Sequence, residues 1–206
     1  MGDRDQEAFW RGGFGDEYSE RNVGGSIVSS NTFLFAEVLS SMADKPLDVF
    51  EMGANVGLNY LALSALIPNI RYTGLEVNPS AAEKLASLGC NSINESIYDF
   101  ESSNTYDLVL SKGVLIHINP NLLAEVYEKL FRFSRRYILL AEYYSPSPVE
   151  IDYRGHSGRL FKRDFAGEML DSYPSLNLAS SGFAYHRDRF PQDDLTWFLR
   201  EKGTHA

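Results

Sequence analysis

Apolar runs of strand length alternate along the chain with apolar residues at helical spacing. The runs cover Leu47–Met52, Arg71–Glu76, Cys90–Ile93, Tyr106–Leu110 and Tyr137–Ala141, and the helical patterns cover Val56–Ile67, Ala81–Leu88 and Leu122–Phe133. The run Tyr106–Leu110 is nearly continuous, as is typical of a strand buried on both faces of a parallel sheet. Alternation at this spacing predicts an open, Rossmann-like, doubly wound α/β sheet.

The C-terminal third is less regular. Pro146 and Pro148 end the alternation, and the following stretch is irregular until Phe161–Leu170, where the pattern predicts a helix. Two final strands are predicted at Leu176–Ala179 and Gly182–Tyr185. Together with the five runs above, they complete a mostly parallel sheet of seven strands.

The N-terminal segment differs in composition from the rest. We divide the chain into a helical segment over residues 1–45 and a single compact domain over residues 46–206. The first segment carries Phe9, Trp10, Phe14 and Tyr18, whose rings must be buried against something. It either covers the mouth of the sheet as a lid or packs as an inert helix. The mixture of Tyr18, Arg21 and Asn22 just before the Gly24-Gly25 pair favours the lid.

Composition narrows the possible partners. The chain has 206 residues, of which 44% are hydrophobic and 23% charged, as in an ordinary globular protein. Its net charge of −9 disfavours nucleic acid and anionic membranes as partners. The single cysteine, Cys90, allows neither an internal disulfide nor a cysteine-based zinc site, and no metal cluster is evident. With no signal-peptide core in Met1–Ala8, we expect a cytoplasmic protein, monomeric or homodimeric.

A glycine-containing turn follows the first predicted strand, in the segment Glu51-Met-Gly53-Ala-Asn55-Val-Gly57. Such a turn before a helix lets backbone N–H groups approach a ligand. The dinucleotide fingerprint would need glycine at positions 53, 55 and 58, and only Gly53 is present. A nicotinamide-dependent sugar-modifying enzyme is therefore the weakest alternative. Asn55 tolerates a positive φ better than most residues, so it can preserve the turn.

These residues resemble the first motif of class I S-adenosylmethionine-dependent methyltransferases, with Glu51 as its acid. The resemblance implies that the donor S-adenosylmethionine, and its product S-adenosylhomocysteine, contact residues at the ends of successive strands and in the N-terminal segment. Glu76, about twenty residues after the turn, is placed to bind ribose hydroxyls. The implied donor-binding residues are Tyr18, Arg21, Asn22, Glu51, Gly53, Ala54, Asn55, Gly57, Glu76, Asn78, Ser96, Ile97, Ser111 and Lys112.

The segment from Asp107 to Pro120 is similar to the fourth motif of the same family, whose turn faces the substrate. Within it, a neutral His117 can act as general base toward a hydroxyl or amine. It can equally be a half-buried residue bonded to the backbone. Glu142 is the second catalytic candidate. Residues expected to face the acceptor, a small molecule, are Tyr143, Tyr144, Arg154, His156 and Arg159.

Over nearly its full length the chain resembles the pseudaminic acid biosynthesis-associated methylases. The resemblance rests on Phe9–Asn22, Glu51–Asn59, Lys112–Pro120 and the tail from Gly182 to Trp197. It implies transfer of a methyl group to a hydroxyl or amine of a sugar or sugar-derived metabolite of a bacterial surface-glycan pathway. A non-catalytic protein that binds S-adenosylmethionine as a partner subunit remains the alternative, because sequence does not prove turnover.

Overall fold

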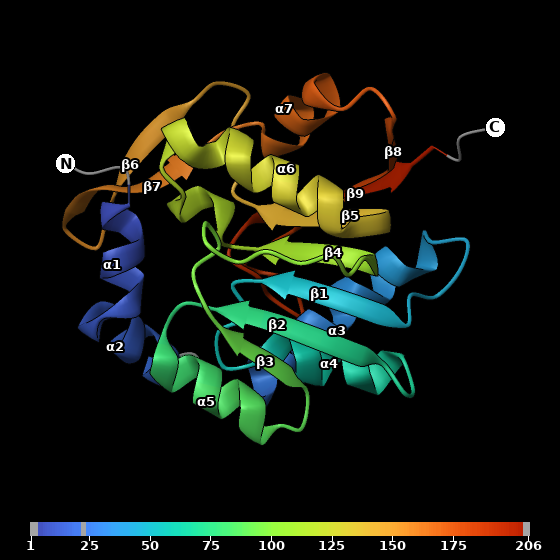
Figure 1. Ribbon diagram of the computed structural model, residues 1–206, viewed down its shortest axis with the longest axis horizontal. Helices are drawn as coiled ribbons and strands as arrows, with labels where there is room; N and C mark the ends of the chain where they lie inside the picture. The colour runs from blue at the N-terminus through green and yellow to red at the C-terminus, as the bar shows by residue number, and fades with distance from the viewer. Residues whose placement is uncertain (1–3, 22–23, 204–206) are drawn as a thin grey trace.

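The computed structural model describes residues 4–21 and 24–203 and contains a seven-stranded sheet covered by helices on both faces (Figure 1). The strands of this sheet are β1 (Asp48–Met52), β2 (Arg71–Glu76), β3 (Asn91–Asn94), β4 (Tyr106–Lys112), β5 (Ser134–Glu142), β8 (Leu176–Ala184) and β9 (Leu195–Lys202). The helices are α1 (Asp5–Arg11), α2 (Gly13–Arg21), α3 (Gly25–Ser40), α4 (Leu58–Leu66), α5 (Pro79–Ser87), α6 (Leu123–Phe133) and α7 (Phe165–Ser172), with short 3-10 turns η1 (Leu115–His117) and η2 (Pro120–Leu122).

The strand order is β3-β2-β1-β4-β5-β9-β8. The first five strands are parallel, whereas β9 runs antiparallel to β5 and to β8. The direction in which successive strands are added reverses between β1 and β4. In open α/β sheets ligands bind outside the carboxyl ends of the strands at such a switch point. The doubly wound, mostly parallel sheet predicted from the sequence is confirmed.

The two faces of the sheet bury separate apolar clusters. On one face, α3 and α4 pack side chains such as Leu34, Phe35 and Leu63 against the strands. On the other, α6 and α7 contribute Val126 and Met169 among others. Since α3 belongs to the layer that covers the sheet, only α1 and α2 of the N-terminal segment lie over its carboxyl edge. The division at residue 45 remains a prediction.

The C-terminal region departs from the predicted elements. Leu176–Ala179 and Gly182–Tyr185 are not two strands: residues 176–184 form the single strand β8, with an irregularity between Leu178 and Ser180. The seventh strand is instead β9, which the sequence reading missed. Its Arg200 is fully buried and donates to the Ala166 carbonyl at 3.1 Å. Because this charged residue interrupts the apolar pattern, β9 did not read as an interior strand.

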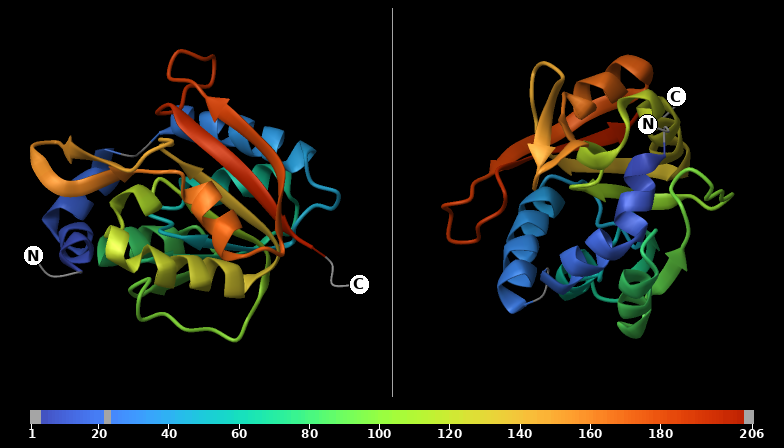
Figure 2. Two further views of the ribbon diagram at one scale, coloured as in Figure 1. Left: turned by 90° about the horizontal axis from the view of Figure 1, so that it is seen from above. Right: turned by 90° about the vertical axis from the view of Figure 1, so that its left-hand side faces the viewer.

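A second departure lies between β5 and α7. The stretch expected to be irregular forms an antiparallel hairpin of β6 (Val149–Tyr153) and β7 (His156–Lys162), turned at Arg154 and Gly155, both with positive φ. The hairpin lies beside α1 (Figure 2). The Gln6 side chain of α1 donates to the Gly158 carbonyl of β7 at 3.1 Å, which joins the two segments.

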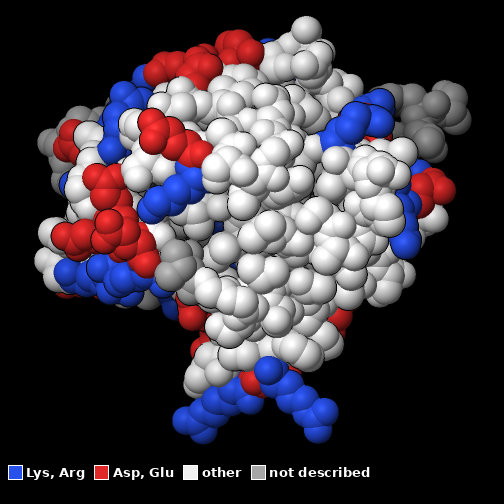
Figure 3. All heavy atoms as spheres, turned by 90° about the horizontal axis from the view of Figure 1, so that it is seen from below, with Lys and Arg blue, Asp and Glu red and all other residues white. Residues whose placement is uncertain are grey.

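The surface is unevenly charged. Seen from below, the surface over the α3 and α4 layer carries few charged side chains (Figure 3), in keeping with the single charged residue, Glu37, in these two helices. The loop between β8 and β9, which contains Arg187 and Arg189, projects from the body of the molecule (Figure 2). Among residues 4–21 and 24–203 no helix is long and apolar enough to cross a membrane.

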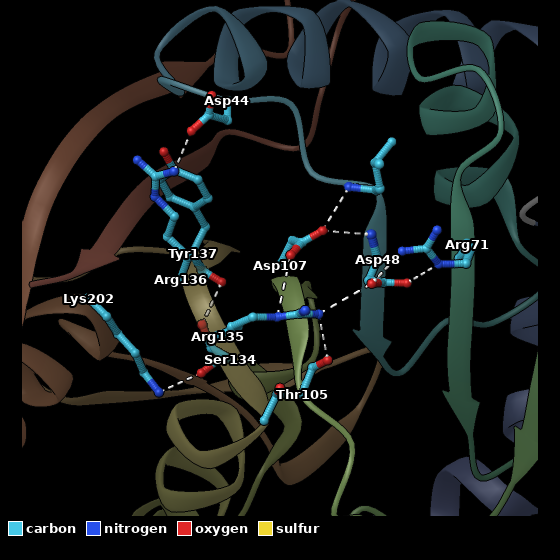
Figure 4. A network of polar contacts seen from close by, with 11 residues as sticks. Asp44, Asp48, Arg71, Thr105, Asp107, Ser134, Arg135, Arg136, Tyr137 and Lys202 are labelled. Atoms are coloured by element: carbon cyan, nitrogen blue, oxygen red, sulfur yellow. Dashed lines mark hydrogen bonds and ion pairs between the residues drawn. The ribbon is translucent and has the colours of Figure 1, made fainter. Parts of the chain in front are cut away.

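A network of charged groups ties the amino-terminal ends of the strands together, at the edge opposite the switch-point ends (Figure 4). One Asp107 oxygen accepts from the backbone N–H groups of Leu47 and Asp48, both at 3.0 Å. The Arg71 guanidinium beside Asp48 holds the pKa of that carboxyl below its ordinary value. Arg135 donates to the Thr105 carbonyl at 2.9 Å and pairs with Asp48 at 3.2 Å. The network fixes where β1 begins relative to β4.

We expect Asp107→Ala to lower the free energy of unfolding by about 2 kcal/mol, because two backbone N–H groups lose their acceptor. Urea denaturation measures the change. The matched control is Asp44→Ala, which removes the pair with Arg136 at a carboxylate that is 77% exposed and should cost about 0–1 kcal/mol. Equal losses for the two variants would contradict the assignment.

Candidate active site

A cavity of about 210 Å³ lies at the carboxyl ends of the central strands, at the switch point. Its walls come from the turns after β1, β2, β3 and β4, and its roof from α1 and α2. Nine residues expected to form the site line it: Tyr18, Gly53, Ala54, Asn55, Glu76, Asn78, Ile97, Lys112 and His117. The fold therefore gathers residues that lie up to about a hundred positions apart in the chain.

The turn after β1 forms the floor. Gly53 and Gly57 have φ of 77° and 84°, and Asn55 has φ of 47°, so the asparagine keeps the positive φ expected of it. A Cβ at Gly53 would lie 2.5 Å from a methyl group of Val114. Gly57 does not line the cavity. Its conformation starts α4, and a Cβ there would meet Leu85 at 2.7 Å.

Glu76 is held in place by backbone amides. One carboxylate oxygen accepts from the Asn55 N–H at 2.7 Å and the other from the Asn78 N–H at 2.8 Å. Burial raises the pKa of this carboxyl, and the backbone hydrogen bonds oppose the shift. Each oxygen keeps a further lone pair for a ligand hydroxyl. The carboxylate is thus presented to the cavity in one orientation.

Side-chain hydrogen bonds hold the roof over the cavity. Ser19 of α2 donates to the Asn55 side chain at 2.7 Å, and the Asn78 side chain donates to Asp16 at 2.9 Å. Ser96, in the turn after β3, donates to Glu7 of α1, and Gln6 reaches the hairpin as described above. A Cβ at Gly15 would lie 1.8 Å from the Trp10 carbonyl oxygen, so the roof needs glycine there.

Glu51 lies behind the cavity wall, where a chain of hydrogen-bonded amide side chains ends at its carboxyl group. Gln192 donates to Asn31 at 2.9 Å, Asn31 donates to Asn59 at 2.8 Å, and Asn59 donates to Glu51. The second Glu51 oxygen has no hydrogen-bond partner among the described residues. Burial raises the pKa of Glu51 to about 8, against the opposing effects of the Asn59 hydrogen bond and the nearby Lys112 charge.

Lys112 ends β4 and lines the cavity. Burial lowers the pKa of its ammonium group, while the charges of Glu51, Asp193 and Glu142 raise it. Asp193 comes from the loop between β8 and β9, close to Gln192. This loop therefore contributes to the surroundings of the site.

His117 lines the cavity in a neutral form. Its Nδ1 lies 2.6 Å from the Arg159 carbonyl oxygen, so Nδ1 carries the proton and Nε2 does not. Its ring packs against Trp10, with centroids 4.5 Å apart. Burial lowers the pKa of His117 to about 4, and the hydrogen bond only partly offsets the loss of hydration. His117 therefore both forms a hydrogen bond with the backbone and lines the cavity, two roles that the sequence analysis treated as alternatives.

Glu142 and Ser111, in contrast, do not line the cavity. Ser111 donates to Glu142 at 2.8 Å, and the N–H groups of Val114 and Leu115 donate to the same Glu142 oxygen, each at 3.1 Å. Burial raises the pKa of Glu142 to about 7. The carboxyl shapes the turn after β4 from behind, because its surroundings are protein backbone and not the cavity. Direct contact of Glu142 with an acceptor does not follow from this position.

The residues expected to bind the acceptor also lie off the cavity. Tyr144 is 43% exposed, Arg154 and His156 are exposed at the tip of the hairpin, and Arg159 lies over the ring of Phe9. Tyr143 is half-buried against the apolar cluster, where burial raises the pKa of its hydroxyl.

Arg21 and Ser96, which were also expected to bind the donor, do not line the cavity. Arg21 pairs with Glu17 on the outside of α2. Asn22 lies outside the described residues. Ser96 is buried and contacts the cavity-lining Glu7.

The sequence reading missed Asn31, Asn59 and Glu7 as cavity residues. One signal was available: an asparagine lies in each of the helices α3 and α4, which together carry a single charged residue. Nothing in the local pattern identifies Glu7, because its position on the cavity depends on how α1 packs. Within the described part of the chain no cluster of three or more His, Cys, Asp or Glu residues could hold a metal ion.

Solved structures of methyltransferases with bound S-adenosylhomocysteine share the fold. The 1,6-didemethyltoxoflavin-N1-methyltransferase of Burkholderia thailandensis is 14% identical, with a TM-score of 0.73 over 99% of this chain and 92% of that one. Magnesium protoporphyrin IX methyltransferase of Synechocystis PCC 6803 is 13% identical, with a TM-score of 0.70 over 97% of this chain and 100% of that one. The plantazolicin methyltransferase BpumL is 14% identical, with a TM-score of 0.68 over 98% of this chain and 95% of that one.

The fold is that of the class I methyltransferases. Identities this low show the fold and leave the chemistry to be argued from the residues. Comparisons with family models and with curated protein sequences found no match.

The low pKa of His117 has a consequence for stability. Between pH 6.5 and about 4 the unfolded chain binds a proton at this imidazole and the folded chain does not, so stability falls as pH falls through this window. From pH 7.5 to pH 5 we expect the wild type to lose about 2 kcal/mol more than His117→Phe, measured by urea denaturation. His156→Phe, which replaces an exposed imidazole with a phenyl ring, should lose as much as the wild type. Equal losses in all three proteins would contradict the assignment.

Proposed function

We propose that the protein is an S-adenosylmethionine-dependent methyltransferase that moves a methyl group to a hydroxyl or amine of a small molecule. One observation supports this above the others. In a class I methyltransferase fold, the cavity at the switch point presents the Glu76 carboxylate between two backbone amides, next to a turn built from positive-φ residues. A carboxylate so fixed suits the two hydroxyls of a ribose.

The residues along the cavity offer partners to successive parts of the donor. The turn from Gly53 to Asn55 would bring backbone close to the ligand, and Glu76 would hold the ribose hydroxyls. Lys112 would hold the donor's carboxylate through its ammonium group. When bound, S-adenosylmethionine supplies a methyl group on a sulfonium that needs no further activation. The chain's own task is to align the acceptor and exclude water.

His117 is the residue we propose for proton removal. Its Nδ1 is held by the Arg159 carbonyl, which leaves the unprotonated Nε2 for an acceptor in the cavity. A base whose pKa is about 4 is too weak to ionise a neutral hydroxyl beforehand. It can take the proton while the acceptor oxygen or nitrogen gains positive charge. The proton is therefore transferred in the same step in which the bond to carbon forms.

For the acceptor we propose a sugar or sugar-derived metabolite. Polar side chains of α3 and α4 on the cavity support this: the amides of Asn31 and Asn59 can bind hydroxyls. The resemblance of the N-terminal and tail motifs to methylases of surface-sugar pathways points the same way. Methylation assays with free acidic sugars, nucleotide-activated sugars and small aromatic amines discriminate between acceptor classes.

Donor binding is the first test. At one hundred times its Kd, S-adenosylhomocysteine should stabilise the protein by about 2.7 kcal/mol, and NAD should not. Glu76→Gln should weaken the affinity at least tenfold in calorimetric titration, because the amide cannot accept from both backbone N–H groups. The control is Glu83→Gln, an exposed residue on α5. A response to NAD alone would contradict the donor assignment.

The role of His117 is tested by turnover. His117→Phe should lower kcat about a hundredfold, as for a lost general base, with the Kd for S-adenosylhomocysteine within about twofold of the wild type. The wild-type kcat should stay constant down to pH 5, since the pKa of His117 is about 4. His156→Phe again serves as control. Unchanged turnover in His117→Phe would exclude the base, and donor binding without turnover on any acceptor would favour a non-catalytic partner protein.

A further inference from the structure

A carboxylate on the roof faces the β3 end of the cavity. Glu7 of α1 lines the cavity there, and its side chain is 13% exposed. It stands over the turn after β3, where Ile97 also lines the wall. The Glu7 carboxylate comes from α1, more than eighty residues before β3 in the chain.

The Glu7 carboxylate is fixed at both oxygens. Oε2 accepts from the Ser96 hydroxyl, and Oε1 accepts from Arg11 at 2.9 Å. The Ser96 oxygen in turn accepts from the backbone N–H of Tyr98 at 3.1 Å. The turn after β3 thus orients the carboxylate through a serine. Each oxygen still has a lone pair free for a third donor.

The donor's base must lie at this end, if the proposed function holds. Glu76 on β2 would hold the ribose, and His117, the residue proposed to face the acceptor, follows β4 on one side of it. The sulfonium must point toward His117, so the base would extend the other way, toward β3. There Val77 and Ile97 offer apolar surface to its faces, and Glu7 offers an acceptor to its edge.

We propose that Glu7 recognises the exocyclic amino group of the donor's adenine and thereby excludes 6-oxopurine donors. A carboxylate accepts from the amino group, whereas the carbonyl oxygen of hypoxanthine would face it with no proton between them. This inference rests on the proposed function. It assigns α1 a role in choosing the base, beyond covering the cavity.

Glu95 provides a matched comparison. It also lines the cavity near Ile97, but it is exposed, and no described residue forms a hydrogen bond or ion pair with its carboxylate. A carboxylate whose side chain can rotate toward solvent discriminates poorly between a base edge that donates a hydrogen bond and one that accepts it. Glu7→Gln and Glu95→Gln make the same chemical change at one end of the same cavity, so they separate the two candidates.

The experiment compares two ligands by calorimetric titration: S-adenosylhomocysteine and S-inosylhomocysteine, whose base carries oxygen in place of the amino group. The wild type should prefer the adenine compound at least tenfold. Glu7→Gln should reduce that preference to within about threefold, because its amide can face either base. Glu95→Gln should keep the wild-type preference. Ser96→Ala leaves the Glu7 carboxylate in place but removes the hydroxyl that orients it, so its preference for the adenine compound should be intermediate. This variant provides the test if Glu7→Gln does not fold.

Three outcomes would overturn the inference while leaving the proposed function intact. The wild type binds both compounds equally, Glu7→Gln weakens both equally, or Glu95→Gln removes the preference in place of Glu7→Gln. Failure of the wild type to bind S-adenosylhomocysteine at all would instead overturn the proposed function. Asp99→Asn controls for loosening of α1, because Asp99 pairs with Arg4 at 2.7 Å on the outside of the roof, and it should weaken both ligands equally, if at all.

Discussion

The site depends on a single buried carboxylate and the backbone amides that hold it. Glu76 ends β2, and its two hydrogen bonds come from the turn after β1 and from the start of α5. These bonds compensate for burial and fix three segments relative to one another. Asn78 then extends the arrangement, since its side chain both caps α5 and binds Asp16 in the roof. The turn after β1, the start of α5 and the helix α2 are therefore joined through Glu76 and Asn78.

Around this anchor the protein suppresses charge. Burial raises the pKa values of Glu51 and Glu142 to about 8 and about 7, and lowers those of Lys112 and His117. All four groups shift toward their neutral forms, as expected where ions leave water. Two of these groups, Glu51 and Glu142, stand behind the cavity walls, whereas Glu7, Glu76, Glu95 and Lys112 line the cavity itself. Backbone and amide side chains orient this lining through hydrogen bonds.

The sequence predicted the sheet and the floor of the site because both follow from local patterns. Apolar runs identify β1, β2, β4 and β5, and the acid and glycine spacing identifies the turn from Glu51 to Gly57. It failed for β9, where a buried Arg200 bonds to a helix carbonyl that no local pattern reveals. It also expected the acceptor at Arg154 and His156, which lie at the tip of a hairpin that no local pattern predicted, and that assignment stays a prediction. The contribution of α1 depends on packing between distant segments and is equally invisible in the pattern.

The amide chain that ends at Glu51 has a direction. Every N–H in it points the same way, from Gln192 through Asn31 and Asn59 to the carboxyl. Aligned hydrogen bonds of this kind polarise one another, so the bond that attaches the β8–β9 loop to α3 and the bond that Glu51 accepts belong to one continuous network. The projecting loop is thereby held to the body of the molecule through the same amide side chains that contact the carboxyl behind the cavity wall.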